Sequence, residues 1–103
     1  MEGDFSADGA RRYRATLADV FRRNLHYYRK ARGMKQWELG VLVGYRDHSA
    51  ISKIERGEMR ATPERQHAIA LALEVPLALL LWEPFPPPFP PPFLPATGET
   101  PES

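Results

Sequence analysis

Residues 36–57 read QWELGVLVGYRDHSAISKIERG, and this stretch decides the fold. Its apolar residues recur at helical spacing up to Gly44, and a second apolar stripe, Ile51 and Ile54, ends at Gly57. Two short helices around a turn fit this pattern, but neither is long enough to be stable alone in water. We therefore expect them to pack on each other and on neighbouring helices, which leaves one polar face of the second helix exposed.

The flanking segments supply the neighbouring helices. Before the stretch, an apolar stripe predicts a helix that begins at Thr16 at the latest and stops before Gly33. After it, Thr62-Pro63-Glu64 is a strong helix start, and Val75-Pro76 separates that helix from a short last one near residues 77–81. No period-two run indicates a strand. The sequence predicts an all-α domain of five helices.

Composition divides the 103 residues into three parts. Residues 1–15 are small, polar and arginine-rich, and we expect a flexible basic N-terminal arm there; an N-terminal extension of the first helix is the alternative. Residues 16–83 form the folded domain. Residues 84–103 hold nine of the eleven prolines and predict a largely irregular proline-rich tail.

The net charge of +1 hides an asymmetry along the chain. Residues 1–32 carry a net charge of +4 and residues 33–60 of +1, whereas residues 61–83 and 84–103 carry −2 each. A positive front half suits a polyanionic partner. The polar face of the third helix, with His48, Ser49, Ser52 and Lys53, has a size and polarity that fit the major groove of DNA.

Three motifs in order carry a resemblance to a known family. They are RGMKQ at 32–36, SAISKIERG at 49–57 and ALALEVPL at 70–77. At this spacing, residues 21–81 resemble the helix-turn-helix domain of the lambda repressor/Cro-like (XRE family) regulators. The resemblance implies a five-helix lambda-repressor-like domain in which the second and third helices read DNA.

The resemblance also implies roles for individual residues. The positions that face DNA bases near the helix at 47–56 are Asp47, His48, Ser49, Ser52 and Lys53. The positions near phosphates are Gln36, Arg46 and Arg60. Arg29 and Glu55 look like the ion pair that ties the first helix to the third. Independently of the family, Asp47 is a plausible N-cap of the third helix.

The leading hypothesis is a sequence-specific, DNA-binding transcriptional regulator that occupies a promoter or operator, such as a repressor. The other interpretation of the polar face is a merely solvated helix surface. One such domain reads few base pairs, so we expect a homodimer. Its candidate interface is Leu71, Leu79 and Trp82, although these residues could instead fill gaps in the core or hold the tail.

The tail carries the alternative function. Phe85, Phe89 and Phe93 recur every four residues among the prolines, so they could contact a protein partner or fold back on the domain. The chain would then be a protein-interaction adaptor or antitoxin-like partner protein, with DNA binding secondary. An inert, solvated tail is the third possibility.

Several classes of function are not expected. The chain has no cysteine, and His26, His48 and His67 share no spacing typical of metal ligands, so we expect no metal and no cofactor. No nucleophile–base set or phosphate-cradling loop is visible, so we predict no enzymatic activity. No apolar run is long enough to span a membrane, and we expect a cytoplasmic protein.

Overall fold

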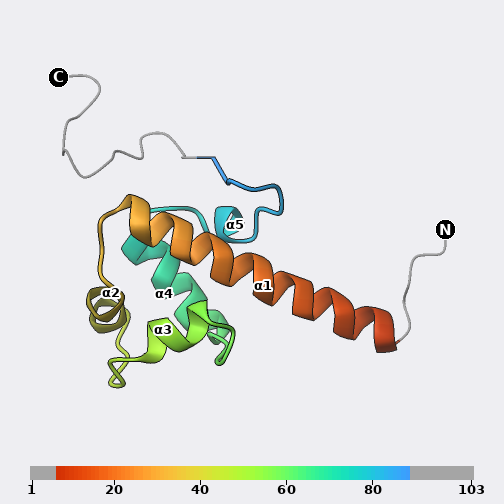
Figure 1. The fold of residues 1–103 in the computed structure, drawn as a ribbon, viewed down its shortest axis with the longest axis horizontal. Coiled ribbons are helices and arrows are strands. Elements are labelled where there is room, and N and C mark those ends of the chain that lie inside the picture. Colours follow the sequence, from red (N-terminus) through yellow and green to blue (C-terminus); the bar gives the residue numbers. More distant parts are fainter. Residues whose placement is uncertain (1–6, 89–103) are drawn as a thin grey trace.

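The computed structural model describes the backbone of residues 7–88 and the side chains of residues 16–88. This part of the chain contains five helices and no strand: α1 (Ala7–Ala31), α2 (Gln36–Leu42), α3 (Ala50–Glu55), α4 (Pro63–Leu73) and α5 (Leu77–Leu80). In Figure 1, α1 runs along the length of the molecule, α2, α3 and α4 lie below it, and the chain after α5 passes above it. The predicted all-α, five-helix architecture is confirmed.

A single hydrophobic core joins the helices. α1 contacts α3, α4 and α5, while α2 contacts α3 and α4. The largest apolar side chains that are fully buried come from all five helices: Leu25, Tyr28, Leu39, Ile51, Ile69, Leu73 and Leu80. Because α2 and α3 have only seven and six residues, this shared core is what stabilises them.

The helix ends follow the local sequence signals in most places. Thr62 is the N-cap of α4, and its hydroxyl accepts a hydrogen bond from the backbone N–H of Arg65 at 3.2 Å, with Pro63 in the first turn. α4 ends at Leu73, and its C-cap is Glu74, a non-glycine residue in the left-handed region with φ of 63°. Arg32 Nη2 donates to this glutamate's Oε1 at 2.7 Å, which ties the end of α4 to the end of α1.

The structure selects between the alternatives at both ends of the predicted domain. Residues 7–15, assigned to a flexible arm, form the first turns of α1, because this alanine- and arginine-rich segment has good helix propensity and no proline to stop it. Residues 84–88, assigned to the tail, pack on α1, and Pro87 is buried. The rest of the arm, residues 1–6, and of the tail, residues 89–103, lies outside the described residues.

Gly40 offers a test of how α2 is stabilised. It lies inside the helix, and a Cβ added there would lie 3.6 Å from Cγ1 of Ile51, an ordinary van der Waals distance. Gly40→Ala is therefore expected to raise the free energy of unfolding by up to about 1 kcal/mol, measured by urea unfolding. Gly57→Ala is the contrasting variant: its φ of +79° is strained for alanine, so it should destabilise. A loss of stability in Gly40→Ala would contradict the packing described here.

Candidate DNA-binding surface

The packing of α2 against α3 determines which face of α3 is exposed. Ala50, Ile51 and Ile54 of α3 are buried against the core, as are Leu39 and Gly40 of α2. The polar residues between them point outward: His48 is exposed, and Ser49, Ser52 and Lys53 are partly exposed. α3 therefore presents the polar face that the sequence predicts.

Asp47 organises the start of this face. Its Oδ1 accepts hydrogen bonds from the backbone N–H and the hydroxyl of Ser49 at 2.9 and 2.8 Å, and its Oδ2 accepts one from Lys53 Nζ at 3.1 Å. These contacts, the backbone bond from Ser49 above all, lower the pKa of Asp47 to about 2. The carboxylate stays charged near neutral pH and holds both side chains in place.

The predicted N-cap at Asp47 is wrong. α3 begins at Ala50, and Ser49 is its N-cap. Asp47 precedes the cap by two residues because its side chain closes a local turn onto Ser49, while its backbone carbonyl accepts from the N–H of Ala50 at 3.1 Å. Asp47 and His48 therefore lie on the turn before α3 and not within the helix.

α4 braces the turn between α2 and α3. Arg65 Nη1 donates to the backbone carbonyl of Val43 at 2.8 Å, and its guanidinium lies 4.3 Å from the centroid of the Tyr45 ring. Gly44, between these two residues, has φ of +89°, a left-handed conformation that glycine adopts without strain. A side chain of α4, which is not part of the α2–α3 pair, therefore holds the turn that leads to Arg46.

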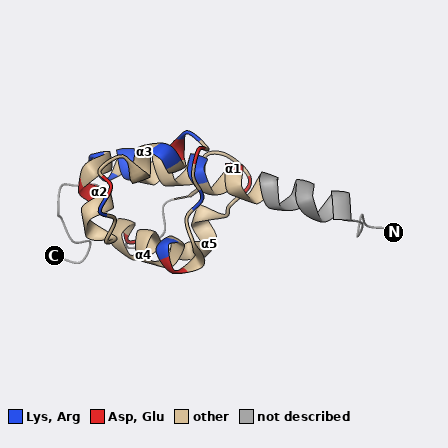
Figure 2. Cartoon of the chain, turned by 90° about the horizontal axis from the view of Figure 1, so that it is seen from below, with Lys and Arg blue, Asp and Glu red and all other residues tan. Residues whose placement is uncertain are grey.

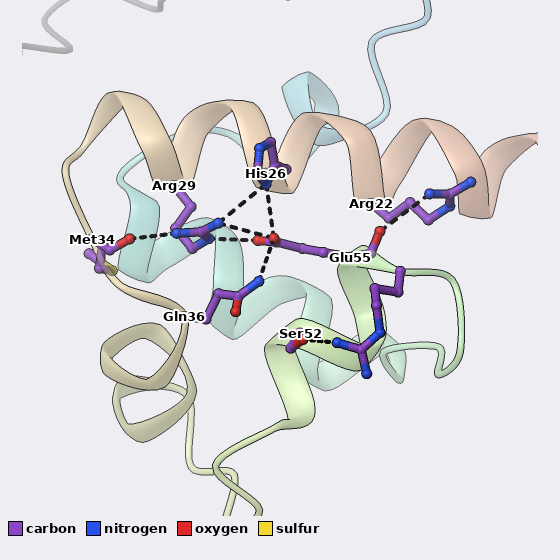
Figure 3. Close-up of polar contacts among 8 residues, drawn as sticks. Arg22, His26, Arg29, Met34, Gln36, Ser52 and Glu55 are labelled. Atoms are coloured by element: carbon purple, nitrogen blue, oxygen red, sulfur yellow. Dashed lines mark hydrogen bonds and ion pairs between the residues drawn. The ribbon is translucent and has the colours of Figure 1, made fainter.

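Glu55 lies at the centre of a partly buried polar network (Figure 3). Arg29 Nε donates to its Oε2 at 2.6 Å and Arg29 Nη2 to its Oε1 at 3.1 Å, and the side chains of the pair are only 8% and 6% exposed. Gln36 Nε2 donates to Oε1 at 2.9 Å, and His26 Nδ1 lies 2.9 Å from the same oxygen. The structure thus contains the Arg29–Glu55 ion pair and adds Gln36 and His26 to it.

This network sets the ionisation of Glu55 and joins three helices. Burial alone would raise the pKa of Glu55, but hydrogen bonds from Arg29, His26 and Gln36 outweigh it and hold the pKa below its ordinary value. Arg29 Nη1 also donates to the backbone carbonyl of Met34 at 2.8 Å. The end of α1, the start of α2 and the end of α3 are therefore held in one arrangement.

Gln36, one of the expected phosphate contacts, is oriented by this network. Its amide nitrogen carries two hydrogens, and the bond to Glu55 uses one of them. The adjacent backbone N–H of Lys35 donates to Glu38 Oε1 at 2.8 Å, so that carboxylate already lies at the start of α2. Arg46 and Arg60, the other two expected phosphate contacts, are exposed.

Arg56 is a cation beside the polar face that the sequence interpretation missed. It donates to the hydroxyl of Ser52, one turn earlier in the chain, and to both carboxylate oxygens of Glu58 at 2.9 and 3.0 Å. The four-residue spacing of Ser52 and Arg56 was a usable signal, because such residues share a helix face. In Figure 2, most lysine and arginine positions lie on the α3 side of the described molecule.

Comparison with known proteins now identifies the domain. A family model described as a helix-turn-helix domain matches residues 20–82, more than half of the chain. The chain belongs to the helix-turn-helix domain family. The helix-turn-helix pair of this domain is formed by α2 and α3. The predicted resemblance to the lambda repressor/Cro-like regulators is confirmed for the helix-turn-helix domain.

Two solved structures resemble the helix-turn-helix domain. One is the crystal structure of a hypothetical transcription factor, NHTF, from Neisseria, with 29% identity, a TM-score of 0.61, and coverage of 66% of this chain and 77% of that one. The other is the restriction-modification controller protein C.AhdI from Aeromonas hydrophila, with 28% identity, a TM-score of 0.57, and coverage of 63% and 96%. No curated protein sequence matches the chain significantly.

The expected dimer residues of the helix-turn-helix domain differ in their surroundings. Leu71 on α4 is 69% exposed and Trp82 is 42% exposed. Leu79 is only partly exposed and packs against the hydrophobic core, so it contributes to the fold of the single chain. Two of the three positions thus remain on the surface.

Two further properties of the described residues bear on function. None of the helices within residues 7–88 combines the length and apolar character needed to cross a membrane. Within that same part of the chain, no three His, Asp or Glu side chains are grouped so that they could hold a metal ion.

Proposed function

We propose that the protein is a transcriptional regulator that binds specific double-stranded DNA sequences by placing α3 in the major groove. The observation that carries the proposal is the division of α3 into a buried apolar face and an exposed face that bears Ser49, Ser52 and Lys53. The names of the two similar structures, a transcription factor and a controller protein, support the same class of function.

The proposed contacts follow from the geometry of this face. Asp47 and Lys53 hold an acceptor and a donor side by side, 3.1 Å apart. A carboxylate can accept from N4 of cytosine and an ammonium group can donate to O6 or N7 of guanine, so the pair suits one C·G base pair. His48, Ser49 and Ser52 would contact the neighbouring base edges.

Phosphate contacts would fix α3 in the groove. Gln36 keeps one N–H free of the bond to Glu55, and it would donate this hydrogen to a phosphate beside the start of α2. Arg46 and Arg60 are exposed on the turns before and after α3, where they would flank the groove and contact the two strands.

A dimer would give the protein its specificity. One domain reads few base pairs, and two copies on half-sites about 34 Å apart would read a pseudo-palindromic site. The side chains of Leu71 and Trp82 are exposed and therefore accessible to a second copy.

Lys53→Ala tests the proposed function. We expect it to weaken binding to a DNA motif selected from random sequence by about 1–3 kcal/mol, or about 5- to 150-fold, and to relax the preference at one base pair. The measurement is fluorescence anisotropy over a series of salt concentrations. Lys30→Ala, which removes the same charge from an exposed position on α1, is the matched control and should keep the base preference. Failure to select any motif, or equal effects of both variants, would overturn the proposal.

A further inference from the structure

The segment after α5 is bound to α1 by specific contacts. We call residues 84–88 the strap. Just before it, Arg23 Nη2 donates to the backbone carbonyls of Trp82 and Glu83 at 2.9 and 2.8 Å. The guanidinium of Arg23 then lies 4.9 Å from the centroid of the Phe85 ring. The start of the strap is therefore fixed on one side of α1.

Two tyrosines complete the binding site for the strap. The ring of Tyr27 meets the Phe85 ring edge to face, with centroids 5.4 Å apart. The hydroxyl of Tyr28 donates to the backbone carbonyl of Pro88 at 2.5 Å. Pro87, the preceding residue of the strap, is buried. Burial raises the pKa of Tyr28 to about 12, so its hydroxyl keeps the proton that it donates. Arg23, Tyr27 and Tyr28 together form a site for a Phe-Pro-Pro-Pro segment, which we call the α1 groove.

The sequence contains this ligand twice. Residues 85–88 and residues 89–92 are both Phe-Pro-Pro-Pro, and Phe93 follows. The α1 groove recognises a phenylalanine ring, a buried proline and a carbonyl three residues after the phenylalanine, and the second repeat supplies all three. Each chain therefore carries one such groove and two segments that match it.

We propose that two copies of the protein form a dimer by strap exchange, in which residues 89–92 of each copy replace the strap in the α1 groove of the other copy. Such an exchange is a low-cost route to a symmetric dimer, because residues 89–92 repeat the sequence of residues 85–88 and can make equivalent contacts. Residues up to Glu83 stay in place, since Asn24 and Arg23 hold the carbonyl of Trp82. The displaced residues 84–88 then bridge the copies, and five residues in a polyproline conformation span about 15 Å.

The second repeat is what makes this exchange possible. We call a single chain closed when its strap occupies its own α1 groove. In this closed state residues 85–88 reach the groove with no further linker, so the closed state dominates at low concentration. In the exchanged dimer the first repeat becomes the linker and the second repeat becomes the ligand. The two states thus use different phenylalanines on the same groove.

This difference gives opposite predictions for two matched variants. Phe85→Ala removes the ring contacts with Arg23 and Tyr27 from the closed chain only, and we expect it to lower the dimer dissociation constant at least about 5-fold, since aromatic pairs contribute about 1 kcal/mol. Phe89→Ala removes the corresponding contacts from the dimer only and should raise that constant by a similar factor. The measurement is sedimentation equilibrium of the full chain without DNA.

Further variants separate strap exchange from other assemblies. Tyr28→Phe removes the hydroxyl bond from both states and should change the dissociation constant less than either phenylalanine variant. Leu71→Asp tests a dimer made through the exposed surface of α4, and under strap exchange it should leave the constant within about 2-fold. Because these measurements contain no DNA, their outcome is independent of the test on Lys53.

Some results with these variants would exclude strap exchange. Phe89→Ala decides the question even if Phe85→Ala perturbs folding, because residue 89 lies beyond the strap. Unchanged dimerisation in Phe89→Ala, or a protein that remains monomeric in every variant at high concentration, would exclude the exchange. Nuclear Overhauser contacts between Phe89 of a labelled copy and Tyr27 of an unlabelled copy would demonstrate it directly.

Discussion

Glu55→Ala is expected to lower the free energy of unfolding by about 3–5 kcal/mol. The variant leaves the guanidinium of Arg29 in a site where its side chain is 8% exposed, without the carboxylate that neutralises it. It also removes the acceptor for Gln36 and the partner of His26. Since small domains are stable by about 5–15 kcal/mol, this loss brings the protein close to unfolding. Urea unfolding followed by circular dichroism measures it.

A double-mutant cycle separates the ion pair from simple loss of packing. Arg29→Leu and Glu55→Leu each leave one unpaired buried charge, whereas the double variant leaves none. We expect a coupling of about 1–3 kcal/mol, with the double variant more stable than the sum of the single variants predicts. Additive losses would mean that the two side chains contribute independently, contrary to the geometry in Figure 3.

The local sequence signals account for most of the helices. Thr62-Pro63-Glu64 predicted the start of α4 because capping and proline at the first helical position act within a few residues. The start of α3 was missed, since Asp47 could satisfy either its own turn or the helix, and only the packing of Ile51 and Ile54 places the first helical residue at Ala50. The exposed and buried faces of α3 followed from the apolar spacing alone.

The long-range parts of the site could not be read from spacing. Gln36 and His26 meet Glu55 across 19 and 29 residues, and no periodicity encodes such a contact. The Arg29–Glu55 pair was expected only through the family resemblance. Likewise, a proline-rich segment has no internal hydrogen bonds, so its docking depends on the side chains that α1 offers to residues 84–88.

Asn24 connects this docking to the stability of the whole domain. Its side chain is fully buried, and Nδ2 donates to the carbonyls of Leu79, Leu80 and Trp82 at 3.2, 3.2 and 2.9 Å. These carbonyls lie at the end of α5, where the helix stops supplying donors, although the N–H of Trp82 also donates to the carbonyl of Leu79 at 3.3 Å. The two hydrogens of the Asn24 amide are therefore shared among three backbone carbonyls, which lie at the end of α5 and just before the strap.

Asn24→Ala is expected to lower the free energy of unfolding by about 1–3 kcal/mol, because it leaves the buried carbonyl of Leu80 without its donor and removes one of the donors to the carbonyls of Leu79 and Trp82. Asn24→Asp is the matched control: it keeps the size and the oxygen that accepts from Arg23 Nε at 3.3 Å, but replaces the donor with an acceptor. It should therefore destabilise more than alanine at neutral pH and less at acidic pH, where the protonated carboxyl can donate once. Urea unfolding at both pH values measures this, and an Asp variant as stable as wild type at neutral pH would show that the three carbonyls do not need the amide.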